Sequence, residues 1–314
     1  MPIGLVPRVA TGTGPAVPRR TPGRSEIPAF EAVVFAGGGN RCLWQAGFWS
    51  AAAEPLGLAP RRAAAASAGA AIACVLFAGR TAAGLAHFKA ATAANRHNAY
   101  PVNLFRGRPV FPHAAMYRRA LLELIDEAAL ARLHGGPEVI VPVTRAPRWL
   151  GTRAPFAVAG VADALEHAFA PRVHARLARR LGFQAEYASV RECESADALA
   201  DLVLASSCTP PFTPLLHHAG RPVLDGGIAD NVPVDAAGDG PVLVLLTRPF
   251  RRLPQHPLRT YVQPSRPVPV RSWDYTDPAG LQAAFDLGQH DGDAFAAAVR
   301  RSRSESFPPL RYSC

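Results

Sequence analysis

Three short segments of the sequence hold residue types that together could carry out acyl transfer. A glycine triplet at 37–39 offers backbone N–H groups that no side chain shields, Ser67 lies within Ala-Ala-Ser-Ala-Gly, and Asp225 precedes two glycines. An acyl-transfer site needs donors for a developing oxyanion, an attacking oxygen, and a group that takes its proton. The combination therefore indicates a serine hydrolase.

The glycine triplet follows a short, apolar, β-prone run at 32–36 and precedes a helical stretch from about 43 to 53. Glycine lets a substrate oxygen approach the backbone N–H groups there, and the helix N-terminus adds positive potential. An ordinary strand-to-helix turn is the alternative for this segment alone. A dinucleotide-binding fingerprint fits poorly because its third glycine would fall on Cys42, and a P-loop is excluded because no Gly-Lys-Ser/Thr follows.

Ser67 lies between a run at 63–66 and a helix-forming run at 70–78, with Ala65 and Gly69 two positions away on either side. A nucleophile elbow needs small residues at those two positions, because larger side chains would clash in the strained turn. Alanine stands in the first of them instead of glycine, which weakens the match. The alternative role for Ser67 is an N-cap at the start of the helix.

Asp225 follows a short strand at 221–224 and begins a glycine turn, where an aspartate is also common for structural reasons alone. A carboxylate with an ordinary pKa of about 4 is a weak base toward a serine hydroxyl, so it must lie within hydrogen-bonding reach in a partly desolvated site. The alternative is a Ser-Asp-His triad in α/β-hydrolase order, with His256 or His290 as the base. Both histidines lie in stretches typical of surface residues, so the dyad is favoured.

A fourth segment, Ala-Ser-Ser-Cys-Thr-Pro-Pro-Phe at 205–212, precedes the aspartate. Together with the glycine triplet and Arg41, the elbow, and the Asp-Gly-Gly turn with Asn-Val-Pro at 231–233, it resembles the patatin-like phospholipase family over roughly 32–250. The resemblance implies a three-layer α/β/α sandwich with a mainly parallel central sheet. The site residues that it implies are Ser67 as nucleophile, Asp225 as base, and the backbone of Gly37, Gly38 and Gly39 as the oxyanion hole.

Two positions depart from the family pattern. Ala65 replaces the usual glycine before the nucleophile, and Cys42 stands where the glycine-rich pattern usually closes with glycine. Both residues are small, so we expect the geometry to survive with some shift in elbow strain or pocket shape. Arg41 is expected either to anchor the glycine loop or to meet a lipid phosphate.

The predicted activity is a cofactor- and metal-independent hydrolysis of carboxylic esters, with lipid or lysophospholipid acyl chains as the expected substrate. One alternative is a catalytically weak or silent lipid-binding protein of the same fold, favoured by Ala65 and Cys42. Another is an acyltransferase, which would use the same acyl-enzyme with an acceptor other than water.

A single catalytic domain is expected at 30–300, between a disordered arm at 1–29 and a polar tail at 301–314. The arm mixes Pro, Gly, Thr and Arg without apolar periodicity, and it lacks the apolar region of a secretory signal. The longest apolar run, 63–79, is mostly alanine and glycine and falls short of the roughly 20 apolar residues of a membrane span.

The formal net charge of +10 comes almost wholly from arginine, with Lys89 the only lysine. One interpretation is peripheral contact with an anionic membrane, at about 1 kcal/mol per basic residue near the lipid; the favoured one is the compositional bias of a GC-rich genome. Nucleic-acid binding is not expected, because no recognised motif accompanies the charge. Five scattered cysteines without a C-x-x-C pair argue against a zinc site or a disulfide framework and favour a cytoplasmic location.

Alternating strands and helices after the elbow predict a mainly parallel sheet covered on both faces. Strands are expected at 138–144 and 241–247, helices at 113–133, 163–169, 197–204 and 279–300, and a loop at 248–274. A loop with Tyr100, Phe105 and Phe111 precedes the helix at 113–133 and is a candidate lid or acyl-chain wall. The apolar spacing of that helix also fits simple core packing.

Overall fold

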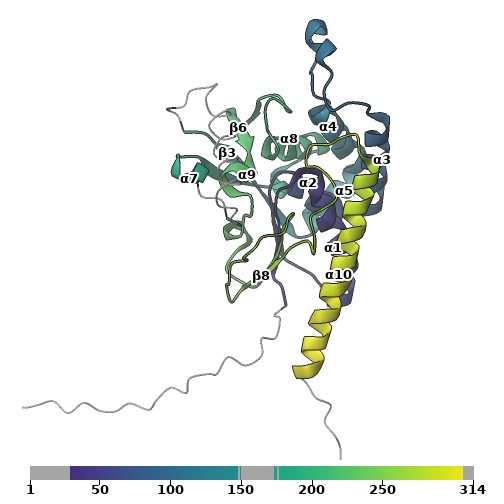
Figure 1. Cartoon of the computed structure of the whole chain (residues 1–314). Helices are drawn as coiled ribbons and strands as arrows, with labels where there is room; N and C mark the ends of the chain where they lie inside the picture. Colours follow the sequence, from purple (N-terminus) through teal and green to yellow (C-terminus); the bar gives the residue numbers. More distant parts are fainter. Residues whose placement is uncertain (1–28, 148, 150–172, 175–176, 307–314) are drawn as a thin grey trace, which may run out of the picture.

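The protein is described by a computed structural model that covers residues 29–147, 149, 173–174 and 177–306 (Figure 1). Its strands form one mixed sheet in the order β5-β6-β3-β2-β1-β7-β8, with β4 also paired to β3. The strands are β1 (Ala32–Phe35), β2 (Arg62–Ala65), β3 (Glu138–Arg145), β4 (Gln184–Ser189), β5 (Leu216–His218), β6 (Arg221–Asp225), β7 (Val242–Leu245) and β8 (Arg259–Val262).

The helices of the described chain lie between these strands and after the last of them. They are η1 (Gly39–Cys42), α1 (Leu43–Leu56), α2 (Ala68–Phe77), α3 (Thr81–Ala94), η2 (Pro101–Arg106), α4 (His113–Leu124), α5 (Glu127–Gly135), α7 (Leu177–Arg180), η4 (Val190–Glu192), α8 (Ala196–Ser206), α9 (Gly226–Asp230), η5 (Asp235–Ala237) and α10 (Pro278–Ser306). None of them is long and apolar enough to cross a bilayer.

The centre of the sheet is parallel and one side of it is antiparallel. β3, β2, β1, β7 and β8 pair in parallel, whereas β4 and β6 run antiparallel to β3. The register of β3 with its two neighbours places the Ser67 elbow and Asp225 at the same height along the sheet: Ala64 pairs with Ile140, and Asp225 pairs with Val143. Ser67 lies three residues beyond Ala64, and Val143 lies three residues beyond Ile140, so the elbow and Asp225 meet across β3.

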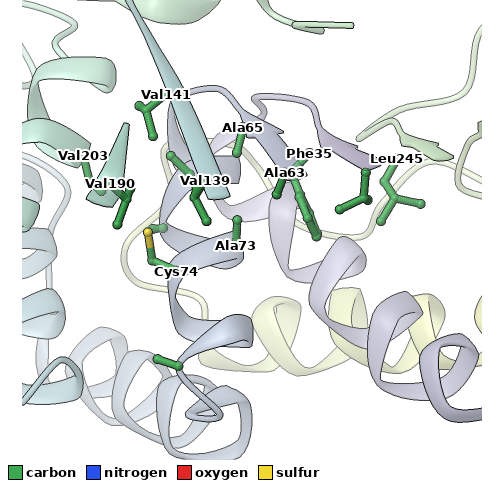
Figure 2. Close-up of a cluster of buried hydrophobic side chains, with 14 of the residues drawn as sticks. Phe35, Ala63, Ala65, Ala73, Cys74, Val139, Val141, Val190, Val203 and Leu245 are labelled. Atoms are coloured by element: carbon green, nitrogen blue, oxygen red, sulfur yellow. The ribbon is translucent and has the colours of Figure 1, made fainter. Parts of the chain in front are cut away.

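One face of the sheet is covered by α1, α2 and α8, and α10 packs against α1; all four helices contribute to one large apolar cluster. Side chains alternate along a strand, so every second residue of β1 and β3 points to this layer. Figure 2 shows Ala63 and Val139 facing Ala73 and Cys74 of α2. Small residues dominate at this contact, and they let α2 approach the sheet closely enough to fix the elbow at its N-terminus.

The opposite face carries shorter helices. The alternate residues of β1 and β7 pack there against Val232 and Ala237, which follow α9. α9 itself lies on β3, where the Thr144 hydroxyl donates to the carbonyls of Asp225 and Gly226 and accepts from the Ala229 N–H. Helices therefore cover both sides of the sheet, as the expected three-layer architecture requires.

Helix α10 runs along α1 at very short distance (Figure 1). A Cβ atom on Gly47 would lie 2.0 Å from the Phe285 carbonyl oxygen, and one on Gly288 would lie 2.1 Å from that of Trp44, so glycine is required at both contacts. The Trp44 indole N–H donates to buried Asp291 at 2.8 Å. These contacts hold the first helix after the glycine triplet in place.

Several sequence expectations need correction. The helix expected at 113–133 is two helices, because Ile125 leaves the helical region and Asp126 starts α5 by accepting from the Ala129 N–H at 2.7 Å. The expected loop at 248–274 contains β8, and the last helix continues to Ser306. The helix expected at 163–169 lies outside the described residues. The Cys42, Cys74, Cys193 and Cys208 thiols are free and buried.

Candidate active site

Ser67 forms a strained turn between β2 and α2. Its φ of 53° and ψ of −131° lie in a region that side-chain-bearing residues rarely adopt, at a cost of about 1–3 kcal/mol. Its side chain makes no capping hydrogen bond to α2, which removes the N-cap alternative. The turn therefore presents the Ser67 hydroxyl instead of using it within the helix, as a nucleophile elbow does.

The two small residues that flank Ser67 have different reasons to be small. A Cβ on Gly69 would lie 2.6 Å from the Phe35 carbonyl oxygen and 2.8 Å from that of Ala36, so only glycine fits. Ala65 pairs with Phe35 at the end of β2 and is fully buried in the large apolar cluster. The elbow torsions thus form with alanine at this position, and the methyl group packs into the core.

The Ser67 hydroxyl donates directly to Asp225, with 2.6 Å between Oγ and Oδ2 and no imidazole between them. Ser67 is 7% exposed and Asp225 is half-buried, so the contact is largely shielded from solvent. The second oxygen of Asp225, Oδ1, accepts from the Gly227 N–H at 2.7 Å. Oδ1 is therefore fixed by the turn, while Oδ2 faces the Ser67 hydroxyl and lies 3.4 Å from the Thr209 hydroxyl.

Ser206 ties the elbow to the neighbouring strand. Its buried hydroxyl accepts from the Ser67 N–H at 3.0 Å and donates to the Pro142 carbonyl at 2.6 Å. Two residues later, the Cys208 carbonyl accepts from the Asp225 N–H at 2.7 Å. The Ala-Ser-Ser segment thus contacts the backbone of both Ser67 and Asp225 and holds them in register.

Gly37 was expected among the oxyanion donors, and the structure corrects this. Its N–H already donates to the Asn231 carbonyl at 3.1 Å, so it is not available to a substrate. A Cβ at this position would lie 2.4 Å from the Asn231 Oδ1 atom and 3.3 Å from the Ser67 Cβ. Gly37 is therefore glycine because the Asp225 turn, the elbow and the glycine loop meet here.

The backbone N–H groups of Gly38 and Gly39 remain available as hydrogen-bond donors, which is what an oxyanion hole needs. The Gly37 carbonyl accepts from the Thr247 hydroxyl at 2.8 Å, and the Gly38 carbonyl accepts from the Arg41 Nε at 3.2 Å. The N–H of a trans peptide points away from its C=O, so the amides of Gly38 and Gly39 point away from these side chains. Neither amide has an acceptor within the part of the chain that the structure describes.

Arg41 and Cys42 continue the glycine loop into η1. The Arg41 contact with the Gly38 carbonyl is the contact of a loop anchor, while its expected role toward a lipid phosphate stays a prediction. The buried Cys42 thiol lies 3.5 Å from the Ala36 carbonyl, and burial raises its pKa well above the ordinary range. Cys42 is therefore a neutral packing residue beside the loop and not a second nucleophile.

A narrow apolar cavity of about 80 Å³ opens beside the elbow. Gly39, Cys42 and Ala68 line it at the end next to Ser67. Its walls come from α2, α3 and α4, and the apolar residues that line it farther from Ser67 are Ile72, Val75, Leu76, Leu85, Phe88, Leu121, Leu124 and Phe285. A cavity of this lining favours an alkyl chain over a polar group.

Comparison with known proteins gives one family. A family model described as patatin-like phospholipase matches residues 33–237, which is more than half of the chain and includes the glycine loop, Ser67 and Asp225. The chain belongs to the patatin-like phospholipase family. This confirms the resemblance seen in the sequence, and membership supports a lipid-hydrolase type of function.

Among solved structures, this patatin-like chain is similar to VipD from Legionella pneumophila. The two share 13% sequence identity, with a TM-score of 0.47, over 86% of this chain and 67% of that chain. No curated protein matches the chain.

In this patatin-like chain, the two histidines considered for a triad lie away from Ser67 and Asp225. His256 is exposed, and its Nδ1 accepts from the Leu258 N–H of its own loop at 3.1 Å. His290 is exposed on α10, in a shallow surface cavity with Ser265 and Arg266. Neither environment includes Ser67 or Asp225.

Three supporting residues of the site were not foreseen in their roles. Thr247 holds the Gly37 carbonyl, Ser206 bridges two strands, and the Ser272 carbonyl accepts from the Asn40 N–H at 3.0 Å. Only Ser206 had a signal in the sequence, because it lies in the Ala-Ser-Ser segment. Thr247 and Ser272 reach the glycine loop from more than 200 residues away, and no local pattern marks such a contact.

Replacing Ala65 with glycine should keep or raise the rate of ester hydrolysis. Glycine is the residue that the family pattern has here, so the elbow should form at least as readily with it, and the change removes one buried methyl group at a cost of about 1 kcal/mol in unfolding free energy. Steady-state kinetics and denaturant unfolding measure the two effects. Ala63→Gly, two residues earlier on the same face of β2, is the matched control and should lose stability without a change in rate. A large loss of activity in Ala65→Gly alone would show that the site depends on the methyl group.

Proposed function

We propose that this protein is a serine acyl hydrolase of the phospholipase A or lysophospholipase type, which cleaves carboxylic esters of lipids with Ser67 as nucleophile and Asp225 as general base. The observation that carries the proposal is the direct 2.6 Å hydrogen bond from the Ser67 hydroxyl to Asp225 Oδ2. The strained elbow and the free amides of Gly38 and Gly39 supply the other parts of an acyl-transfer site.

In the first step, Ser67 Oγ attacks the ester carbonyl carbon while its proton passes to Asp225 Oδ2. The carbonyl oxygen gains the negative charge, and the amides of Gly38 and Gly39 stabilise it by hydrogen bonding. The C–O bond to the alcohol then breaks, and Asp225 returns the proton to the leaving oxygen. The products are the free alcohol and an acyl group bound to Ser67.

In the second step, a water molecule attacks the acyl-enzyme and Asp225 takes the water proton. The tetrahedral intermediate uses the same amide donors, since its oxyanion occupies the same place. Collapse breaks the bond to Ser67, which recovers its proton from Asp225. An acceptor alcohol in place of water would give acyl transfer by the same steps.

The cavity beside the elbow supports a lipid substrate. It is lined almost entirely by apolar side chains, and it begins at Ala68, the residue after the nucleophile. An acyl chain with its carbonyl carbon at Ser67 could extend into this cavity between α2, α3 and α4. A cytoplasmic location also remains our proposal, and the four buried free thiols support it.

A serine-reactive fluorophosphonate probe, followed by a panel of p-nitrophenyl esters and phospholipids, tests the function. Labelling at Ser67 with release of fatty acid from wild-type protein, both absent in Ser67→Ala, is the expected result. Lipid binding without labelling or turnover would favour the silent lipid-binding protein. Transfer of the acyl group to an added alcohol in preference to water would identify an acyltransferase.

Replacing His256 or His290 with alanine should leave most of the activity intact. Each imidazole is exposed and has neighbours outside the dyad, so neither is in the path of the serine proton. The rates of the two variants on a soluble ester are compared with the wild-type rate, after thermal unfolding has shown that the variants are as stable as the wild type. If either folded variant falls as far as Ser67→Ala, the base is an imidazole, and Asp225 only orients it.

A further inference from the structure

The segment between α3 and α4 projects away from the rest of the described chain. It is the blue loop that rises beyond the α4 label in Figure 1 and contains η2. Three of its apolar side chains are strongly exposed: Val102 at 57%, Leu104 at 71% and Phe105 at 90%. Large apolar side chains gathered at the tip of a projection are typical of a contact with a membrane or another molecule.

The projection is internally hydrogen-bonded. The Tyr100 N–H donates to the Val110 carbonyl at 2.8 Å, and the Asn103 side chain donates to the Pro109 carbonyl at 2.9 Å. The Arg108 N–H also donates to the Asn103 carbonyl at 2.9 Å, across the left-handed turn at Gly107. These bonds fix the conformation of the projection itself, in which the three apolar side chains at the tip are exposed.

Positively charged residues follow the tip and lie at the base of the projection: Arg106 and Arg108 come after Phe105, and Arg96 precedes the Tyr100–Val110 hydrogen bond. Arg96, Arg106 and Arg108 are exposed, and in the described part of the chain no carboxylate forms an ion pair with any of them. The sequence contains no acidic residue from 95 to 122. This local positive charge is complementary to any anionic surface. A groove on a partner protein would instead need acidic side chains placed opposite the individual arginines.

We propose that the tip formed by Val102, Leu104 and Phe105, with Arg106 and Arg108 beside it and Arg96 at the base of the projection, docks this protein onto the surface of an anionic phospholipid membrane. The apolar side chains enter the interfacial region while the arginines contact lipid phosphates. The tip connects α3 and α4, which both line the apolar cavity beside Ser67, so docking brings the lipid surface to the helices that border the acyl site. The lipid partner rests on the proposed function, but docking is measured as binding and not as hydrolysis.

Sedimentation with vesicles tests the proposal. The full chain, as wild type and as Leu104→Ser/Phe105→Ser and Arg106→Gln/Arg108→Gln variants, is mixed with vesicles of phosphatidylcholine alone or with one third phosphatidylglycerol. Wild-type protein should bind the anionic vesicles at least about tenfold more tightly than the vesicles of phosphatidylcholine alone. Its binding to the anionic vesicles should weaken as salt rises from about 50 to about 300 mM. The arginine variant should lose about fivefold per residue, and the apolar variant at least about tenfold.

Matched controls separate the tip from general effects. Leu258→Ser removes an exposed leucine and Arg251→Gln/Arg252→Gln removes two exposed arginines, all distant in sequence from the tip, and both variants should bind vesicles like wild type. The tip variants should hydrolyse a short-chain soluble ester at the wild-type rate. Absence of ester hydrolysis in every protein, with vesicle binding preserved, would overturn the proposed function and not the docking site.

Three results would overturn the docking proposal. The first is wild-type protein that does not bind anionic vesicles. The second is a tip variant that binds them as tightly as wild type and the controls do. The third is a concentration-dependent dimer in sedimentation velocity that Leu104→Ser/Phe105→Ser abolishes, without vesicle binding. That third outcome would assign the tip to contact with another copy of the chain.

Discussion

Ser67→Ala and Asp225→Asn should each lower the turnover of an ester substrate by at least about 1,000-fold, because the two residues act as one unit. Alanine removes the attacking oxygen. Asparagine keeps the shape of Asp225 and its acceptor for the Gly227 N–H, but its amide cannot take the proton from Ser67. Single-turnover and steady-state rates on a p-nitrophenyl ester measure the loss.

Conservative changes elsewhere serve as controls for these two variants. Ser50→Ala removes a hydroxyl that only donates to the Ala46 carbonyl within α1, and Asp239→Asn changes an exposed loop aspartate. Both should keep the wild-type rate. Activity above a few per cent of wild type in either dyad variant, with circular dichroism and thermal unfolding unchanged, would refute the dyad.

Gly39→Ala should reduce turnover by at least about 100-fold, which is the usual loss when one oxyanion donor is displaced. Gly39 has a φ of +58°, and its Cβ would lie 2.2 Å from the Ser272 carbonyl oxygen, so the loop must move to accept a methyl group. That movement shifts the amides of Gly38 and Gly39 relative to Ser67. The expected result is a fall in kcat. The free energy of unfolding should also fall by more than the backbone strain of alanine at a positive φ would cost alone.

Gly57→Ala is the matched control for this change. Gly57 has a φ of +61° at the end of α1, and a Cβ there would meet nothing within 4 Å. It therefore has the same unfavourable backbone conformation without the clash, costing about 1 kcal/mol, and should keep the wild-type rate. If Gly39→Ala retains that rate as well, the oxyanion of the reaction is stabilised somewhere other than the glycine loop.

Ser67 and Asp225 could be proposed as nucleophile and base from the sequence because each lies in a local pattern with its own physical reason. A serine between small residues at a strand-to-helix turn predicts an elbow, and the structure forms one, with Gly69 required by contact with the Phe35 carbonyl. Asp225 before a glycine turn was ambiguous alone. Its role was inferred only from the order of the motifs, and the 2.6 Å contact with Ser67 is a long-range fact.

Features that depend on contacts between distant segments could not be read from the sequence. The glycine triplet looked like three equivalent donors, but the Gly37 N–H is used by Asn231, nearly 200 residues later. The break between α4 and α5 was missed because the apolar spacing continues through Ile125, and only the Asp126 cap interrupts the helix. Strand β8 was hidden because it is four residues long in a segment rich in proline and arginine.

The pairing of β3 with β2 on one side and β6 on the other has a consequence for how sequence changes affect the proposed active site. The side chains of Val143 and Ile140 lie outside the Ser67–Asp225 pair, yet their registers with Asp225 and Ala64 set the position of the Asp225 carboxylate relative to the Ser67 hydroxyl. A slip of one residue along a strand displaces it by about 3.3 Å, more than a hydrogen bond tolerates. A single-residue insertion or deletion within β3 would therefore separate Asp225 from Ser67, although both side chains and their local turns remained intact.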